Sequence, residues 1–314
     1  MITLDKIKII STLDKIEIID NTCFQTIIKN DIVVEQKYTA ISPFLIYIEL
    51  DYLGNELVIE FTGKILLDRY NELINKDNFK QCLENINQLG FCKLDIDAIY
   101  AEDEAVKIDV SKDFDYPDFN ALIQSMRGGI RNYNKYIARK LTNGNFIVEK
   151  NVQTKTKKKR LTLYDKGKET RKSENKAFLS AVTNSDQLLN YFEGKVRAEL
   201  NLNSKEQIRS CLKISDTKIV SILNSQASPI WDFIDEIISD DEIDEKINSK
   251  SEYLTRLVLE DNDFDLAKIE AKMRNFCAPG THISQVMKPY RSMLAKIQKG
   301  NKPNLKNELK KILC

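Results

Sequence analysis

The chain has 314 residues, of which 48 are lysine or arginine and 47 are aspartate or glutamate, so its formal net charge is +1. Hydrophobic residues make up 42% and charged residues 30% of it, a composition that is typical of a globular protein and argues against disorder. No apolar stretch approaches the roughly 20 residues that span a bilayer, and the first residues lack the apolar run of a signal peptide. We therefore expect a cytoplasmic protein with no membrane partner.

Cysteine and histidine usage limits the possible chemistry. The six cysteines form no C-x-x-C pair, which favours reduced thiols over a disulfide framework or a zinc knuckle. The only histidine is His282, so metal sites that need two histidines are excluded. Neither G-x-x-x-x-G-K-[ST] nor G-x-G-x-x-G occurs, and no site for nucleotide hydrolysis is visible.

The periodicity of apolar residues predicts an α+β fold, in which an antiparallel sheet with packed helices is followed by a helical C-terminal region. Strands with interspersed helices are expected up to about residue 204, so we predict one domain over 1–204 and a helical region over 205–314. The expected elements, in chain order, are strands from Leu4 and Leu13, a hairpin from Phe44 to Phe61 around Gly54-Asn55, a helix from Asp77 to Gly90, a strand from Phe91 to Tyr100, a helix near Phe119 to Lys140, strands from Asn145 to Val152 and from Lys158 to Asp165, a helix near Ser173 to Tyr191, and a strand from Lys195 to Leu202.

Three of these strands carry polar residues on one face, because side chains alternate across a strand. If the strands share a sheet, one face collects carboxylates, cations and a tyrosine. The alternative is that these are the solvent-facing sides of half-buried strands. The first set is Lys93, Asp95 and Asp97; the second is Arg160, Thr162, Tyr164 and Lys166; the third is Lys195, Arg197, Glu199 and Asn201.

Two aspartates on one strand face indicate a metal site. Asp95 and Asp97 are two residues apart, so their charges repel and favour a counter-ion. With Glu199 they form a set of hard oxygen ligands that suits Mg²⁺ or Mn²⁺. We expect one of these ions as the cofactor.

A basic run precedes Tyr164 and is a candidate nucleic-acid contact, together with Lys93. A local cationic patch is sufficient to bind phosphates, although a solvated hairpin turn would have the same composition. A tyrosine among cations can act as a nucleophile toward phosphorus, with Lys166 or Arg197 neutralising the developing charge. The run consists of Lys155, Lys157, Lys158, Lys159 and Arg160.

Three segments resemble the Rep-trans family of rolling-circle replication initiators: GFCKLDIDAIY (90–100), RLTLYDKGKE (160–169) and VRAELNL (196–202). Their order is also similar to that in phage gene II type replication proteins and in conjugative-element relaxases. The resemblance covers roughly residues 1–204, and its specific part is the pair of motifs Y-D-K-x-x-E and R-x-E. It implies a sequence-specific, metal-dependent enzyme that nicks and joins DNA at a plasmid, phage or mobile-element origin.

The resemblance also implies roles for single residues and for partners. Tyr164 matches the nucleophile and Asp95 lies in the strand that supplies an acidic ligand, while the second acid is Asp97 or a later one such as Glu102. Single-stranded or hairpin origin DNA is the implied substrate, with a host helicase and a second copy of the chain as further partners. The remaining motif residues are Lys166, Glu169, Arg197 and Glu199.

Two other functions remain open. A hydrolytic, metal-dependent DNA nuclease would use Asp95, Asp97 and Glu199 to activate water and would leave no covalent adduct. A non-catalytic protein that binds origin DNA would need no divalent metal.

Overall fold

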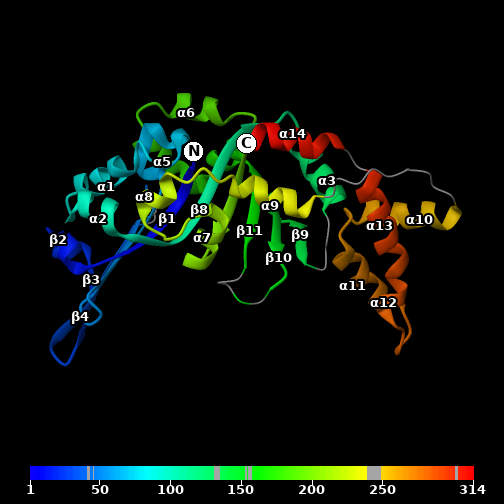
Figure 1. The fold of residues 1–314 in the computed structure, drawn as a ribbon, viewed down its shortest axis with the longest axis horizontal. Coiled ribbons are helices and arrows are strands. Elements are labelled where there is room, and N and C mark those ends of the chain that lie inside the picture. The colour runs from blue at the N-terminus through cyan, green and yellow to red at the C-terminus, as the bar shows by residue number, and fades with distance from the viewer. Residues whose placement is uncertain are drawn as a thin grey trace. The chain divides into compact units, whose positions relative to one another are not determined.

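The computed structural model describes the chain except for residues 41, 42, 45, 131–134, 153, 155–157, 239–248, 301 and 302. The described residues form two compact units: unit 1 comprises Met1–Asp115 and Val152–Ile230, and unit 2 comprises Tyr116–Asn151 and Trp231–Cys314 (Figure 1). The units do not divide at residue 204, because the helices that directly follow it belong to unit 1 and one of them packs against a long strand of that unit.

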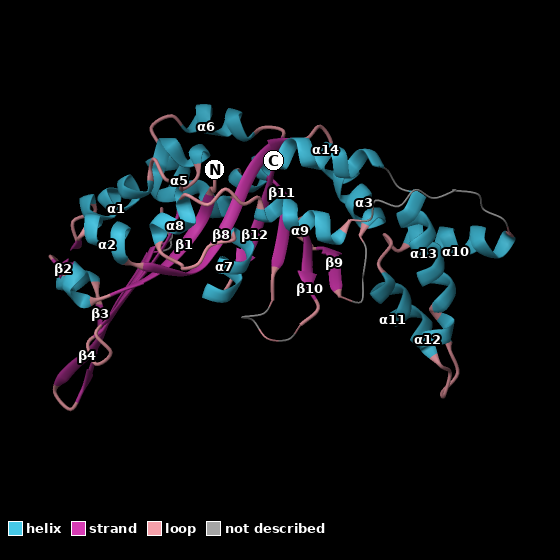
Figure 2. Cartoon of the chain, viewed as in Figure 1, coloured by secondary structure: helices cyan, strands magenta, loops and turns pink. Residues whose placement is uncertain are grey.

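Unit 1 is built on a large sheet, and every strand pairing described within this unit is antiparallel. In spatial order its strands are β3 (Gln25–Lys29), β4 (Ile32–Ala40), β5 (Ile46–Asp51), β6 (Glu56–Thr62), β1 (Leu4–Ser11), β8 (Glu104–Asp115), β12 (Lys195–Leu202) and β11 (Arg160–Asp165). The long strand β8 runs between β1 and β12 (Figure 2). A separate two-stranded sheet pairs β2 (Ile16–Ile18) with β7 (Cys92–Leu94).

Helices surround this sheet. A 3₁₀ segment, η3, covers Gly63–Glu72. Aromatic and aliphatic residues of η3, α5 and α6 form a buried cluster beside the last two strands, and this cluster contains Tyr70, Phe178, Leu188 and Phe192. The helices of unit 1 are α1 (Phe79–Gln88), α2 (Ile96–Glu102), α4 (Lys166–Thr170), α5 (Lys176–Ala181), α6 (Ser185–Phe192), α7 (Lys205–Leu212) and α8 (Ile219–Leu223).

Unit 2 is mainly helical. It contains the antiparallel pair β9 (Tyr136–Lys140) and β10 (Phe146–Lys150). Apolar residues of α10, α11 and α13 form a core cluster around Leu259, Ile269 and Leu294. Its helices are α3 (Phe119–Gly129), α9 (Pro229–Ile237, which begins at the last residues of unit 1), α10 (Lys250–Asp261), α11 (Leu266–Phe276), α12 (Ile283–Val286), α13 (Lys288–Gly300) and α14 (Pro303–Leu313).

The fold class is confirmed: the chain combines a large antiparallel sheet with helices, and its C-terminal region is helical. The hairpin around Gly54-Asn55 is also confirmed, because Asp51 pairs with Glu56 across the turn and Asn55 adopts a positive φ of 50°. No helix among the described residues has the length and apolar character needed to cross a membrane.

Four predicted elements differ from the structure. The single helix expected near Ser173 to Tyr191 is a 3₁₀ turn followed by two helices, α5 and α6. The strand expected from Phe91 to Tyr100 ends at Leu94, because Asp95 caps helix α2 by accepting a hydrogen bond from the Ala98 amide at 3.0 Å. The strand expected from Leu13 is a 3₁₀ turn followed by the short β2. The helix near Phe119 to Lys140 stops at Gly129, and its last five residues, Tyr136–Lys140, form β9.

Candidate functional site

One face of the large sheet carries polar side chains where β11, β12 and β8 lie side by side. Buried apolar residues, Val196, Ala198 and Leu200 among them, occupy the opposite face of β12. The register places Tyr164 of β11 opposite Arg197 of β12, and Arg197 opposite Asp113 of β8. Alternation therefore brings residues from distant parts of the sequence onto one surface.

Arg197 is the centre of this face, and its side chain is fully buried. Its Nε and Nη2 atoms donate to the two carboxylate oxygens of Asp113 at 2.6 and 2.7 Å. Its Nη1 atom donates to Asp5 at 2.5 Å and to the Tyr70 hydroxyl at 3.1 Å. A buried guanidinium with two carboxylate partners is held in one orientation, and it fixes both carboxylates in turn.

Asp5 reaches this face because of an irregularity in β1. The register between β1 and β8 shifts between Leu4 and Lys6, so Asp5 is an extra residue in the ladder. Such a bulge re-aims the side chain of the inserted residue. The carboxylate of Asp5 also accepts a hydrogen bond from Tyr70 at 3.2 Å.

Tyr164 points its phenol at Glu199 and donates a hydrogen bond to it. Burial raises the pKa of Tyr164 well above its usual range, the charge of Glu199 adds to this, and Arg197 opposes it. Burial and the charge of Asp5 raise the pKa of Glu199 to about 8. With this pKa Glu199 is only partly ionised at neutral pH, and the ionised form, hydrogen-bonded to the phenol, is placed to accept the phenol proton.

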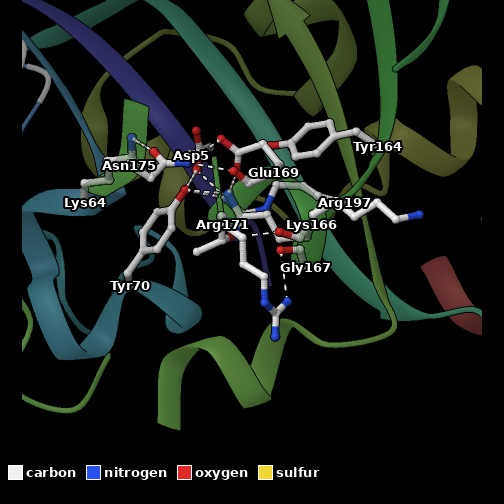
Figure 3. A network of polar contacts seen from close by, with 12 residues as sticks. Asp5, Lys64, Tyr70, Tyr164, Lys166, Gly167, Glu169, Arg171, Asn175 and Arg197 are labelled. Atoms are coloured by element: carbon white, nitrogen blue, oxygen red, sulfur yellow. Dashed lines mark hydrogen bonds and ion pairs between the residues drawn. The ribbon is translucent and has the colours of Figure 1, made fainter. Parts of the chain in front are cut away.

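Lys166 lies beside the tyrosine, and only 2% of its side chain is exposed. Its Nζ atom donates to Glu169 at 2.6 Å and to the Tyr70 hydroxyl at 2.9 Å, and it lies 5.6 Å from the centre of the Tyr164 ring (Figure 3). A β-carbon added at Gly167 would lie 2.9 Å from the Phe192 carbonyl oxygen, so only glycine permits this approach of α4 to α6.

Glu169 connects α4 to the surrounding helices. It accepts a second hydrogen bond from Asn175 at 3.1 Å, and Lys64 donates to Asn175 at 2.7 Å. Burial acts to raise the pKa of Glu169, but the charge and hydrogen bond of Lys166 and the bond from Asn175 outweigh it and lower that pKa to about 2. Burial lowers the pKa of Lys64. Glu169 is therefore ionised at neutral pH and holds the Lys166 ammonium in place.

The donor set fits a hard divalent cation at one side of the cluster. Oε1 of Glu199 accepts the Tyr164 bond, which leaves Oε2 as a ligand atom, and Asp5 is close enough to raise the pKa of Glu199. Mg²⁺ is often bound by one or two carboxylates together with water and substrate oxygens. Among the described residues, no group of three or more acidic, histidine or cysteine side chains is arranged to hold a metal ion. Asp5 and Glu199 are the two carboxylates of this cluster that could bind one.

The structure brings together five of the predicted residues and separates others from them. Asp95 caps α2, and Asp97 lies 2.5 Å from Lys80 with its side chain 85% exposed, so the ligand set of Asp95, Asp97 and Glu199 is not assembled. The reason is that α2 and the small sheet take this segment away from β12. The residues that meet are Tyr164, Lys166, Glu169, Arg197 and Glu199.

The remaining predicted residues have other positions. Glu102, the alternative second acid, pairs with Lys15 at 2.9 Å. Lys93 is exposed on β7, opposite Glu17 in the small sheet. Lys158, Lys159 and Arg160 lead into β11, whereas Lys155 and Lys157 lie outside the described residues.

Sequence reasoning missed Asp5, Tyr70 and Asp113. The alternation of Asp109, Ser111 and Asp113 opposite Ile108 and Val110 was a readable signal for the polar face of β8. No comparable signal exists for Asp5, whose position depends on the bulge.

Comparisons with known proteins give no further information on this site. No family model, curated protein or solved structure matches the chain.

Proposed function

We propose that this protein nicks and rejoins DNA with Tyr164 as the nucleophile, as a rolling-circle replication initiator does at a plasmid, phage or mobile-element origin. The observation that carries the proposal is the hydrogen bond from the Tyr164 phenol to Glu199, a carboxylate with a raised pKa, beside the buried cations Lys166 and Arg197. The order of the Y-D-K-x-x-E and R-x-E motifs supports the same reading.

In the proposed reaction the Tyr164 oxygen attacks a phosphodiester in an unpaired strand while its proton passes to Glu199. A bond forms between the tyrosine oxygen and phosphorus, and the bond from phosphorus to the 3′ oxygen breaks. The 3′ oxygen takes up a proton and leaves as a hydroxyl group. The 5′-phosphotyrosine conserves the phosphodiester bond, so rejoining needs no ATP.

A divalent cation completes the proposed site. Mg²⁺ or Mn²⁺ bound by Asp5 and Glu199 would polarise the scissile phosphate. Arg197 acts as a positioning residue, because its donors are engaged by Asp113, Asp5 and Tyr70. Lys166 orients Tyr70 and adds positive charge beside the Tyr164 ring.

The proposed substrate is single-stranded or hairpin origin DNA, since the scissile bond must reach the face of a sheet. The described cations Lys158, Lys159 and Arg160 precede Tyr164 on the same segment and would contact phosphates. A homodimer and a host helicase complete the proposed partners.

A second candidate is a non-catalytic protein that binds origin DNA. Only 7% of the surface of Tyr164 is exposed. This favours the second candidate, because a buried phenol can have the purely structural role of stabilising the polar face of the sheet. This candidate predicts DNA binding without cleavage and without a metal requirement.

The deciding experiment incubates the full chain with labelled single-stranded DNA from beside its own gene, with Mn²⁺ or with EDTA. A denaturing gel and peptide mapping should show a metal-dependent adduct at Tyr164. Tyr191→Phe is the matched control, since Tyr191 is 38% exposed and lies near Lys195 at the end of β12. Cleavage without an adduct would indicate a hydrolytic nuclease, and binding without cleavage would favour the non-catalytic protein.

A further inference from the structure

Unit 2 contains a cavity of about 350 Å³ that is separate from the tyrosine site. Residues of α3, β9, α11 and α13 line it, and all of them belong to unit 2. Its volume lies within the range of roughly 300–1,000 Å³ that is usual for small-molecule sites. The space is therefore sufficient for one planar heterocycle.

Arg127 is the main polar group of this cavity. Its side chain is 8% exposed, and its Nε atom has no hydrogen-bond acceptor within the part of the chain that is described. Its Nη1 atom donates to the Asp263 carbonyl at 3.2 Å, and its guanidinium carbon lies 5.8 Å from the centre of the Phe146 ring. A buried N–H group without an acceptor is costly, so this atom favours a ligand that supplies one.

Carboxylates line the same cavity. Asp263 lies 3.4 Å from Arg127, and Glu270 is held by Arg274 at 2.7 Å. Asp265 also lines the cavity, where it caps α11 through the amides of Ala267 and Lys268. Lys268 also lies 3.1 Å from Asp263, so at least two of the three carboxylates have cationic partners. The lining therefore offers both donors and acceptors, which favours a ligand that has both.

Aromatic and aliphatic residues supply most of the remaining lining, and these include Tyr136, Phe264 and Leu294; Asn151 and Arg291 are further polar residues of the lining. Phe264 and its neighbour Asp263 both adopt a positive φ, of 57° and 55°, which is uncommon for residues other than glycine. Aromatic side chains together with a few polar groups are the features by which proteins hold an unstacked base.

We propose that this cavity binds a single unstacked guanine base of a DNA strand. Guanine presents the O6 and N7 acceptors that an arginine recognises, and it presents N1–H and N2–H donors that suit a carboxylate. Arg127 would contact the acceptor edge, and Asp263 or Glu270 the donor edge. The inference extends the proposed function, because a base held in unit 2 would add sequence selectivity to the DNA strand that is nicked.

Binding can be measured without nicking, because EDTA withdraws the metal. Fluorescence anisotropy would compare the full chain with a labelled thymidine 12-mer and with the same strand carrying one central guanine. We expect the guanine strand to bind at least tenfold more tightly. Equal affinity for the two strands would overturn the proposal.

Modified guanine bases in the DNA strand test the acceptor edge and the donor edge separately, with the protein unaltered. Inosine, which lacks the N2 amino group, and 7-deazaguanine, which lacks the N7 acceptor, should each lose at least threefold in affinity. A strand with both changes that binds as tightly as the guanine strand would contradict the proposed contacts. Free dGMP that binds more tightly than the guanine strand would overturn the assignment to DNA.

Variants of the lining provide the third test. Arg127→Lys keeps the charge but removes the Nε donor, and it should reduce the guanine preference to within twofold while thymidine binding stays unchanged. Ala267→Leu adds volume in a helix that tolerates leucine and should have the same effect. Retained preference in both variants would refute the site. Tyr164→Phe should keep the guanine preference although it forms no adduct. If the wild-type protein shows the preference but forms no adduct, that result would count only against the nicking proposal.

Discussion

The ion pair between Glu169 and Lys166 gives a prediction with a calculable size. Glu169→Gln preserves the shape of the side chain but removes its charge and leaves the Lys166 ammonium buried. Folding lowers the pKa of Glu169 from 4.5 to about 2, which corresponds to about 3 kcal/mol of stability at neutral pH. Removing one partner of a buried ion pair generally costs a similar amount, about 3–5 kcal/mol. We therefore expect Glu169→Gln to lower the free energy of unfolding by about 3 kcal/mol at pH 7.

The pH dependence follows from the direction of the shift. The folded-state pKa lies below the unfolded value, so the stabilisation is fully present above about pH 4.5 and is lost as the pH falls toward 2. The difference between wild type and Glu169→Gln should accordingly shrink to about 1 kcal/mol near pH 3. Urea unfolding at pH 7, 5, 4 and 3, followed by circular dichroism, measures this difference.

Glu174→Gln is the matched control, because Glu174 is an exposed glutamate on the neighbouring segment. Its effect should be within about 0.5 kcal/mol at every pH, as is usual for surface substitutions. Equal destabilisation by the two variants, or a difference for Glu169→Gln that does not change with pH, would refute the reasoning.

Further predictions concern the tyrosine, its carboxylate neighbours and the buried arginine. Tyr164→Phe should abolish the protein–DNA adduct and leave DNA binding unchanged, which a gel assay and anisotropy would check against Tyr191→Phe. The folded-state pKa of Glu199 is raised from 4.5 to about 8, so the wild-type protein should lose stability as the pH rises from about 4.5 to 8. Melting curves in EDTA should show that Glu199→Gln removes this pH-dependent loss of stability. Asp5→Asn should raise the Mn²⁺ concentration that nicking requires, whereas the double variant Asp95→Asn with Asp97→Asn should leave that concentration unchanged. The opposite result would support the metal site expected from sequence. Arg197→Lys should cost about 3 kcal/mol in urea unfolding, since lysine cannot make the paired bonds to Asp113, and the exposed Arg171→Lys should cost little.

The sequence alone determined the α+β class and showed which face of two strands is polar. Alternation along β12 is a local property with a period of two residues, and it placed Arg197 and Glu199 on one face of that strand. That Tyr164 joins them was predicted on the condition that the two strands share a sheet, and the pairing of β11 with β12 meets that condition. The sequence predicted Lys166 on the strand face of Tyr164, whereas β11 ends at Asp165 and Lys166 begins α4. Lys166 and Glu169 meet because residues three apart share one side of this short helix.

Only the tertiary structure decided which acids join these residues. The Asp95 and Asp97 pattern reads equally well as a strand face or as the start of a helix, and the capping bond of Asp95 selects the helix. Asp5 enters through a bulge, which arises from the pairing of two strands about a hundred residues apart in the chain and leaves no mark in the local sequence. Tyr70 reaches the cluster because η3 packs against the helices that follow β11. Local periodicity therefore gave the tyrosine and its motif, whereas long-range packing selected the carboxylates that control its proton.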